Sequence, residues 1–94
     1  MLSKIPGDFS KISKENLNQE ILRVAIIAEL DAINLYEQLA ALTDNADIKA
    51  VFLDIAKEEK THVGEFQTML LRLDQEQVQE MAAAQKEIKE LTGK

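Results

Sequence analysis

The chain has 94 residues, enough for one domain, and a net charge of −6 at pH 7. It contains no cysteine, which excludes disulfides, zinc–thiolate sites, iron–sulfur clusters and cysteine nucleophiles. The negative charge argues against nucleic acid and anionic membranes as partners, and no apolar run reaches the roughly 20 residues of a membrane span. We therefore expect a cytoplasmic protein with one small domain, stabilised by a metal or by other chains.

Glycine and proline are nearly absent from the body of the chain, where Ala, Leu, Glu, Lys and Gln dominate. This composition is typical of helices, and no alternating strand pattern competes with it. We expect a loosely ordered leader over residues 1–12 and a helical domain over 13–92. The helices of this domain are predicted at about 14–42, 46–73 and 75–91. The sequence therefore predicts an all-α fold, in which an antiparallel two-helix hairpin is followed by a short third helix.

Each long predicted helix carries an apolar stripe that is interrupted by a single acid. In the first helix, steps of three, four and seven residues pass through Leu22, Ile26, Glu29, Ile33, Tyr36 and Ala40. In the second helix, they pass through Phe52, Ala56, Glu59, Val63, Phe66 and Leu70. His62, the single histidine of the chain, follows Glu59 by about one turn on nearly the same face. Because ionised carboxylates are rarely buried without a partner, the two acids mark a candidate site.

The two acids also match in height along the predicted hairpin. If the turn lies near Asp44, residues whose numbers add to about 88 lie at equal height, and Glu29 and Glu59 meet this condition. Each acid then lies about 22 Å from the turn, with His62 one turn further from it. Two carboxylates and one imidazole thus converge, and this set of donors suits iron or manganese better than calcium or a structural zinc.

Other interpretations of these residues stay open on the sequence alone. A Glu-x-x-His motif is frequent by chance in a glutamate-rich chain, so the motif also fits a solvated helix surface. Glu29 also fits a rim residue whose aliphatic stem passes the core. The three residues together also fit a non-catalytic helical adaptor, in which they tie a dimer together. Their shared position and height favour the metal site. Tyr36 is a candidate for a residue that supports the ligands, and Gly64 is interpreted as marking a close helix approach.

One chain supplies half of a known kind of di-iron site. Ferritin-like bundles use a glutamate from each of two helices and a Glu-x-x-His motif from each of the other two. This chain has one such glutamate, Glu29, and one such motif, which runs from Glu59 to His62. Two copies related by a two-fold axis would complete a four-helix bundle, with two iron ions balanced by four carboxylates. We therefore predict a homodimer whose interface contains the metal site.

Two stretches around these residues resemble one family, the encapsulated ferritins, which are half-length ferritin-like proteins housed in encapsulin nanocompartments. The stretches are 21–37 and 56–66, and the resemblance extends over about Leu17 to Thr92. It implies a ferroxidase that oxidises Fe(II) with O2 at a di-iron site between subunits. It also implies a homodimer that assembles into a ring (a decamer), with an encapsulin shell as partner and location. A rubrerythrin-like di-iron peroxide reductase is the alternative enzyme.

The resemblance also assigns roles by motif position. The iron ligands of the family correspond to Glu29, Glu59 and His62. Tyr36 matches a tyrosine that lies near the iron centre in this family. Some relatives carry further acids beside the first ligand, which attract iron, whereas this chain has Ala28 there and retains only Asp31 as a possible entry site. Some members are separate cargo proteins and others are fused to the shell, so we expect a truncated cargo protein or the excised domain of a fusion.

Overall fold

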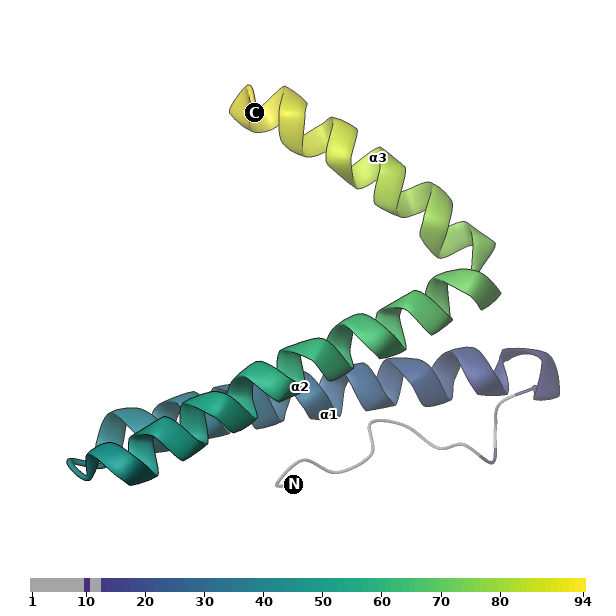
Figure 1. The fold of residues 1–94 in the computed structure, drawn as a ribbon. Helices are drawn as coiled ribbons and strands as arrows, with labels where there is room; N and C mark the ends of the chain where they lie inside the picture. The colour runs from purple at the N-terminus through teal and green to yellow at the C-terminus, as the bar shows by residue number, and fades with distance from the viewer. Residues whose placement is uncertain (1–9, 11–12) are drawn as a thin grey trace.

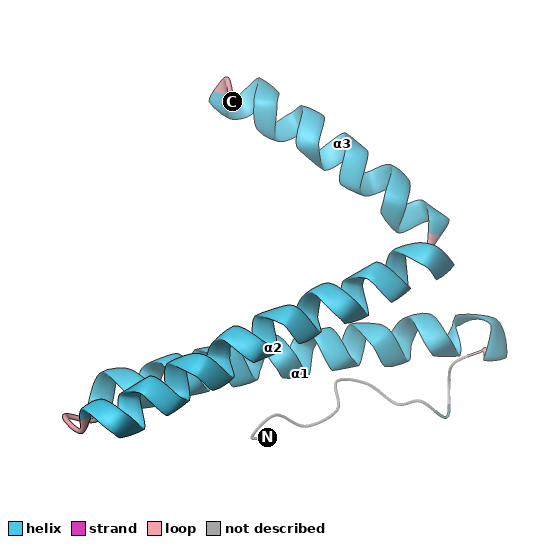
Figure 2. Cartoon of the chain, viewed as in Figure 1, coloured by secondary structure: helices cyan, strands magenta, loops and turns pink. Residues whose placement is uncertain are grey.

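The computed structural model describes Ser10 and residues 13–94, so the expected leader lies almost wholly outside the described residues. The chain forms three helices, α1 over Lys14–Leu42, α2 over Ala46–Leu73 and α3 over Gln75–Thr92 (Figure 1). Figure 2 shows these helices joined by short loops, with no strand in the described part of the chain. None of the described helices combines the length and apolarity that a membrane crossing requires. The expected all-α class is confirmed.

Polar residues stand at the ends of the helices. Asn45 precedes α2, and its side-chain oxygen accepts hydrogen bonds from two backbone N–H groups of the first turn, at 3.0 and 3.1 Å. Asp74 ends α2 and precedes α3, where its Oδ1 accepts a hydrogen bond from the backbone N–H of Gln77 at 3.0 Å. Ser13 takes the same position before α1 but makes no side-chain capping bond. These caps satisfy backbone groups that the end of a helix leaves unpaired.

The two long helices form the antiparallel hairpin, which turns at residues 43–45 (Figure 1). Their inner faces are the two apolar stripes. Tyr36 on α1 stacks on Phe52 on α2, with ring centroids 6.0 Å apart and an interplanar angle of 19°. Among the described residues, the buried core consists of Ile33, Ala40, Ala56 and Leu70. A core of four side chains is small even for a domain of this size, and many large apolar side chains lie outside it.

The third helix leaves the hairpin at a sharp bend, formed by Leu73 and Asp74, which we call the elbow (Figure 1). Two side chains of α1 reach the elbow. Gln19 Nε2 donates a hydrogen bond to the backbone carbonyl of Leu73 at 3.1 Å, and Arg23 Nη1 lies 3.3 Å from Asp74 Oδ2. No residue of α3 is buried. The side-chain contacts of α1 therefore reach the two residues that precede α3, whereas α3 has no buried residue along its length.

Candidate metal centre

Three potential ligands meet between the long helices, about halfway along the hairpin. Glu29 on α1 and Glu59 and His62 on α2 each offer one ligand atom within 4.8 Å of the others. His62 Nδ1 lies 3.6 Å from Glu29 Oε2 and 3.5 Å from Glu59 Oε2. These distances are longer than a normal N–H···O hydrogen bond. They are close to the roughly 3.0–3.5 Å between atoms that share one metal ion at about 2.1 Å.

The local sequence explains why these three side chains meet. Each acid occupies one position of an otherwise apolar stripe, so helix packing brings both acids between α1 and α2. Their side chains are only 20% exposed for Glu29 and 18% for Glu59. His62 lies one turn from Glu59 at the edge of the hairpin, where its side chain is 45% exposed. The group is thus covered on the side of the acids and accessible on the side of the imidazole.

One oxygen of the group lacks a hydrogen-bond partner. Glu29 Oε2 is buried, and it is the one such unpaired side-chain atom found among the described residues. Buried polar atoms are nearly always paired, because an unpaired one retains its full desolvation penalty. A cation bound by this oxygen would remove the penalty. The donor set of two carboxylates and an imidazole, with one buried free oxygen, therefore fits iron.

The other predicted site residues lie apart from this group. Asp31 is not among the three clustered residues, and at two positions from Glu29 it lies on the other side of α1. Tyr36 lies two turns along α1 from Glu29, where it stacks on Phe52. Within the described residues, no further Asp, Glu or His side chain joins the group. The roles of Asp31 and Tyr36 stay predictions.

The interpretation of Gly64 as a close contact between helices is wrong within this chain. A Cβ atom at Gly64 would meet no atom within 4 Å. Gly64 instead borders a groove on the outer surface of α2, together with Thr61, Glu65 and Thr68. The glycine therefore has no packing role inside the hairpin.

Comparison with known proteins places the chain in a family. Residues 20–93 match the family model described as Rubrerythrin. The crystal structure of the encapsulated ferritin domain from Pyrococcus furiosus has a TM-score of 0.85 and 50% sequence identity, over 100% of this chain and 98% of that chain. The chain belongs to the encapsulated ferritins. This encapsulated ferritin thus has the ferritin-like fold whose members bind iron between helices.

Curated relatives of this encapsulated ferritin are longer proteins. A ferritin-like–encapsulin shell fusion protein of Pyrococcus furiosus is 58% identical over 81 residues, which are 86% of this chain and 23% of the fusion protein. The encapsulin nanocompartment cargo protein EncC of Myxococcus xanthus is 46% identical over 56 residues, which are 60% of this chain and 43% of the cargo protein. The chain thus spans less than half the length of either relative.

Proposed function

We propose that this encapsulated ferritin is a ferroxidase, which oxidises Fe(II) to Fe(III) with O2 at a di-iron site made by two copies of the chain. Glu29, Glu59 and His62 of each copy are the ligands. The observation that carries the proposal is the buried Glu29 Oε2, which has no hydrogen-bond partner and lies 3.6 Å from His62 Nδ1. A carboxylate oxygen in that position is best explained by a cation.

The surface around His62 supports a second copy at this place. Residues spaced by three and four along α2 place His62 on one face with the exposed apolar side chains of Ile48, Val51 and Met69. Their exposed fractions lie between 45% and 59%, although each is large and apolar. The same face carries the exposed acids Glu58 and Glu65, one on each side of His62. A two-fold axis beside His62 would cover the apolar side chains of this face and bring two sets of ligands together. The histidine at the edge of the hairpin then lies inside the dimer.

Each ligand has a defined chemical task in this proposal. The two glutamates of each copy supply four negative charges, which balance two Fe(II) ions in a site with little water. In this proposal Glu59 would contact both ions, and His62 would contribute a neutral nitrogen. The two Fe(II) substrate ions each give one electron to O2, which takes up two protons and leaves as hydrogen peroxide. Carboxylates that change between bridging and terminal binding would allow Fe(III) to leave.

The relatives suggest where the oxidised iron goes. One relative is fused to an encapsulin shell, and another is a cargo protein of an encapsulin nanocompartment. We propose that this chain works inside such a compartment and delivers Fe(III) to its lumen for storage. Coexpression with an encapsulin shell protein, followed by iron analysis of the purified shells, tests this part. Shells that contain the chain but no more iron than empty shells would contradict it.

The activity itself is tested by comparing oxidants. Purified chain and Fe(II) are mixed with either O2 or hydrogen peroxide, while O2 consumption and Fe(III) formation are recorded. A ferroxidase turns over with O2, and faster turnover with peroxide would favour the rubrerythrin-like peroxide reductase. The Glu59→Ala variant should lose activity, and Glu58→Ala, which changes an exposed neighbour, should keep it. Absence of activity with both oxidants would leave the non-catalytic adaptor as the explanation.

A further inference from the structure

Two exposed apolar surfaces flank the elbow, one on the hairpin and one on α3. On α1, the large side chains of Ile27 and Leu30 are 46% and 49% exposed. On α3, Met81 and Ile88 are exposed as well, and no residue of that helix is buried. An amphipathic helix gains most of its stability in a protein from packing its apolar face. Contact between the two surfaces would therefore stabilise the chain.

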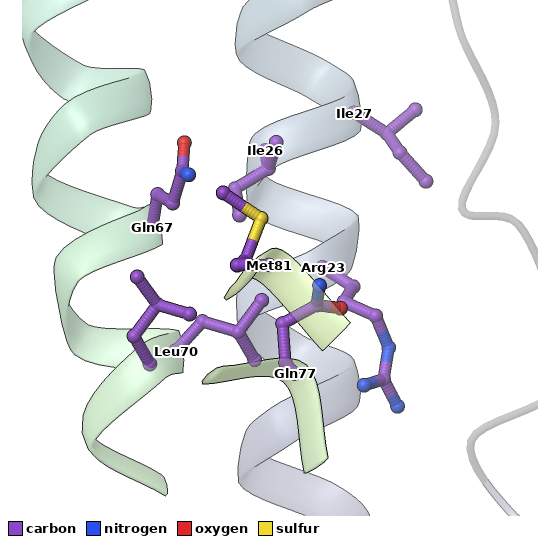
Figure 3. Close-up of a pocket in the computed structure, with 8 residues that line it drawn as sticks. Arg23, Ile26, Ile27, Gln67, Leu70, Gln77 and Met81 are labelled. Carbon is purple, nitrogen blue, oxygen red and sulfur yellow. The ribbon is translucent and has the colours of Figure 1, made fainter. Parts of the chain in front are cut away.

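A cleft lies between these surfaces, and we call it the elbow cleft. Its volume is about 300 Å³, and side chains of all three helices line it. Figure 3 shows Arg23 and Ile27 of α1, Gln67 of α2, and Gln77 and Met81 of α3 around this space. An apolar cavity of about 150 Å³ accommodates a benzene molecule, so the cleft has room for several side-chain atoms. Helix α3 can thus move toward the hairpin before the two surfaces meet.

The cleft walls define a register between α3 and α1. Helix α3 points back from the elbow toward the side of the hairpin tip, so it runs in the same general direction as α1 (Figure 1). On the cleft walls, Gln77 is near the height of Arg23, and Met81 is near that of Ile27; the residue numbers of both pairs differ by 54. Because both helices rise equally per residue, other pairs with this difference come level when α3 lies along the hairpin.

The same register extends the contact beyond the cleft. Ala84 comes level with Leu30, and Ile88 comes level with Asn34. Steps of three and then four residues lead from the cleft wall to these positions on either helix, so each set shares one helix face. The small side chain of Ala84 lets the two helices approach closely at Leu30. Closure in this register would cover the exposed apolar side chains of α1 with apolar side chains of α3.

A single residue joins α2 to α3, which allows α3 to change direction as one unit. Asp74 is the residue between the two helices, and it has φ −118° and ψ 89°. The side chains of Gln19 and Arg23 contact Leu73 and Asp74, which both precede α3. Rotation of the chain after Asp74 can therefore leave these contacts in place. Since α3 has no buried residue, its movement also breaks no buried packing of its own.

The contact surface lies away from the candidate metal centre. Gln67, on the cleft wall, follows His62 by five residues, which is about 140° round a helix of 3.6 residues per turn. A closed α3 would thus leave the face around His62 uncovered. Closure and metal binding can therefore be tested separately.

We propose that α3 is a strap that closes over its own hairpin when the chain is a free monomer, with Met81 against Ile27 and Ala84 against Leu30. The structure shows the open position of this strap. Closure fills the elbow cleft and removes apolar surface from water, which is favourable. Because both surfaces belong to one chain, closure depends neither on protein concentration nor on metal. A partner that binds either surface must displace the strap, so closure restrains association of the free monomer.

Engineered cysteine pairs test the register of the closed position, because the natural chain has no cysteine. The test pair combines Leu30→Cys with Ala84→Cys. The control pair combines Leu30→Cys with Ala82→Cys, since position 82 lies about 200° round α3 from position 84. Each pair is oxidised in dilute protein with chelator. A disulfide requires Cβ atoms within about 4.5 Å, so the test pair should give a cross-linked monomer and the control pair almost none.

Three results of this experiment would overturn the proposal. Equal cross-linking of the two pairs would show a flexible tether without a defined register. Disulfide-linked dimers whose rate of formation rises with protein concentration would show that a second copy, and not the chain's own hairpin, meets this surface. Absence of a cross-link in the test pair would show that the strap does not close.

A second measurement follows closure without a cross-link. Dyes attached through Leu42→Cys and Lys94→Cys report the separation between the hairpin tip and the end of α3, which lie well apart in the open position (Figure 1). Closed α3 would end level with residue 38, about 6 Å along the axis from Leu42. Single-molecule energy transfer, at a dilution that keeps the chain monomeric, should show a high-transfer population. Low transfer alone in the wild-type chain would contradict closure.

Two isoleucines of α1 with nearly the same exposure provide matched variants for this measurement. Ile27 is 46% exposed and lines the cleft, whereas Ile21 is 47% exposed and lies about 120° away round the helix. Ile27→Glu should reduce the high-transfer population at least about tenfold, because closure would bury its carboxylate against Met81. Ile21→Glu should keep that population. Equal loss in both variants, or no loss in Ile27→Glu, would overturn the proposal.

Discussion

Glu29 Oε2 on α1 lies 3.6 Å from Nδ1 of His62 on α2, and it has no hydrogen-bond partner although it is buried. The two residues come from different helices, so their proximity depends on the hairpin and not on local sequence. A bound cation would join them and relieve the isolated oxygen. The consequences of this pairing can be measured as metal binding, independently of turnover.

The ligand variants should lose metal affinity. Replacement of Glu29, Glu59 or His62 by Ala removes a direct ligand, which should weaken Co(II) binding by more than the roughly 10–100-fold typical of residues that only support ligands. Co(II) absorption titrations measure this effect. Glu65→Ala removes an exposed acid one turn from His62 that is not among the three clustered residues, so this variant is the control and should bind normally. If Glu58→Ala behaved like Glu59→Ala, the assigned face of α2 would be wrong.

Metal should promote assembly through the proposed di-iron interface. Two unit charges 4 Å apart repel by about 4 kcal/mol at an effective dielectric constant near 20, so the facing carboxylates disfavour pairing until a cation arrives. Divalent metal converts the repulsion into shared coordination. Size-exclusion chromatography with light scattering should show smaller species with chelator and larger ones with Fe(II) or Co(II). The Glu59→Ala variant should no longer respond to metal, and an unchanged wild-type mass would show that metal has no part in assembly.

The two functions of Asp74 can be separated by substitution. Its Oδ1 caps α3 through Gln77, and its Oδ2 pairs with Arg23, whose side chain is 43% exposed. Asp74→Asn keeps an oxygen for the cap and loses the charge, which should cost at most about 1 kcal/mol. Asp74→Ala loses both, and the missing cap should cost about 1 kcal/mol more. Hydrogen exchange of the first turn of α3 measures both effects. Equal protection in the two variants would contradict the capping role.

The two described glycines should respond in opposite ways to alanine. Gly64 lies inside α2, and a Cβ there meets nothing within 4 Å, so Gly64→Ala should stabilise the chain by about 0.5–1 kcal/mol. Gly93 ends α3 with φ 75°, where an L side chain is strained, so Gly93→Ala should loosen the last turn by about 1 kcal/mol. Thermal unfolding measures the first effect and hydrogen exchange the second. Destabilisation by Gly64→Ala would instead indicate that another copy packs closely at this position.

The helices and the meeting of Glu29, Glu59 and His62 could be predicted because both depend on simple periodicities. A period of 3.6 residues places each acid on an apolar stripe, and one antiparallel turn relates the heights of the two stripes. Tyr36 and Phe52 stack at the heights that this relation requires. The fold class and the geometry of the group therefore follow from local pattern and a single turn.

The elbow could not be predicted in the same way. Gln19 and Arg23 are ordinary polar residues of a helix surface, and no spacing in the sequence links them to Leu73 or Asp74. Their contacts can be inferred only when the relative heights of α1 and α2 and the position of α3 are all known. The sequence also does not show whether a helix cap forms. Ser13 has a side chain typical of an N-cap residue, but it makes no capping hydrogen bond.

The elbow has a geometric consequence for the two parts of the chain. No residue of α3 is buried, so packing along its own length does not hold it against the hairpin. Two side chains of α1 contact the bend instead, Gln19 through the carbonyl of Leu73 and Arg23 through Asp74. Substitution of Gln19 and Arg23 would therefore change the direction of α3 relative to the hairpin while leaving Glu29, Glu59 and His62 in place.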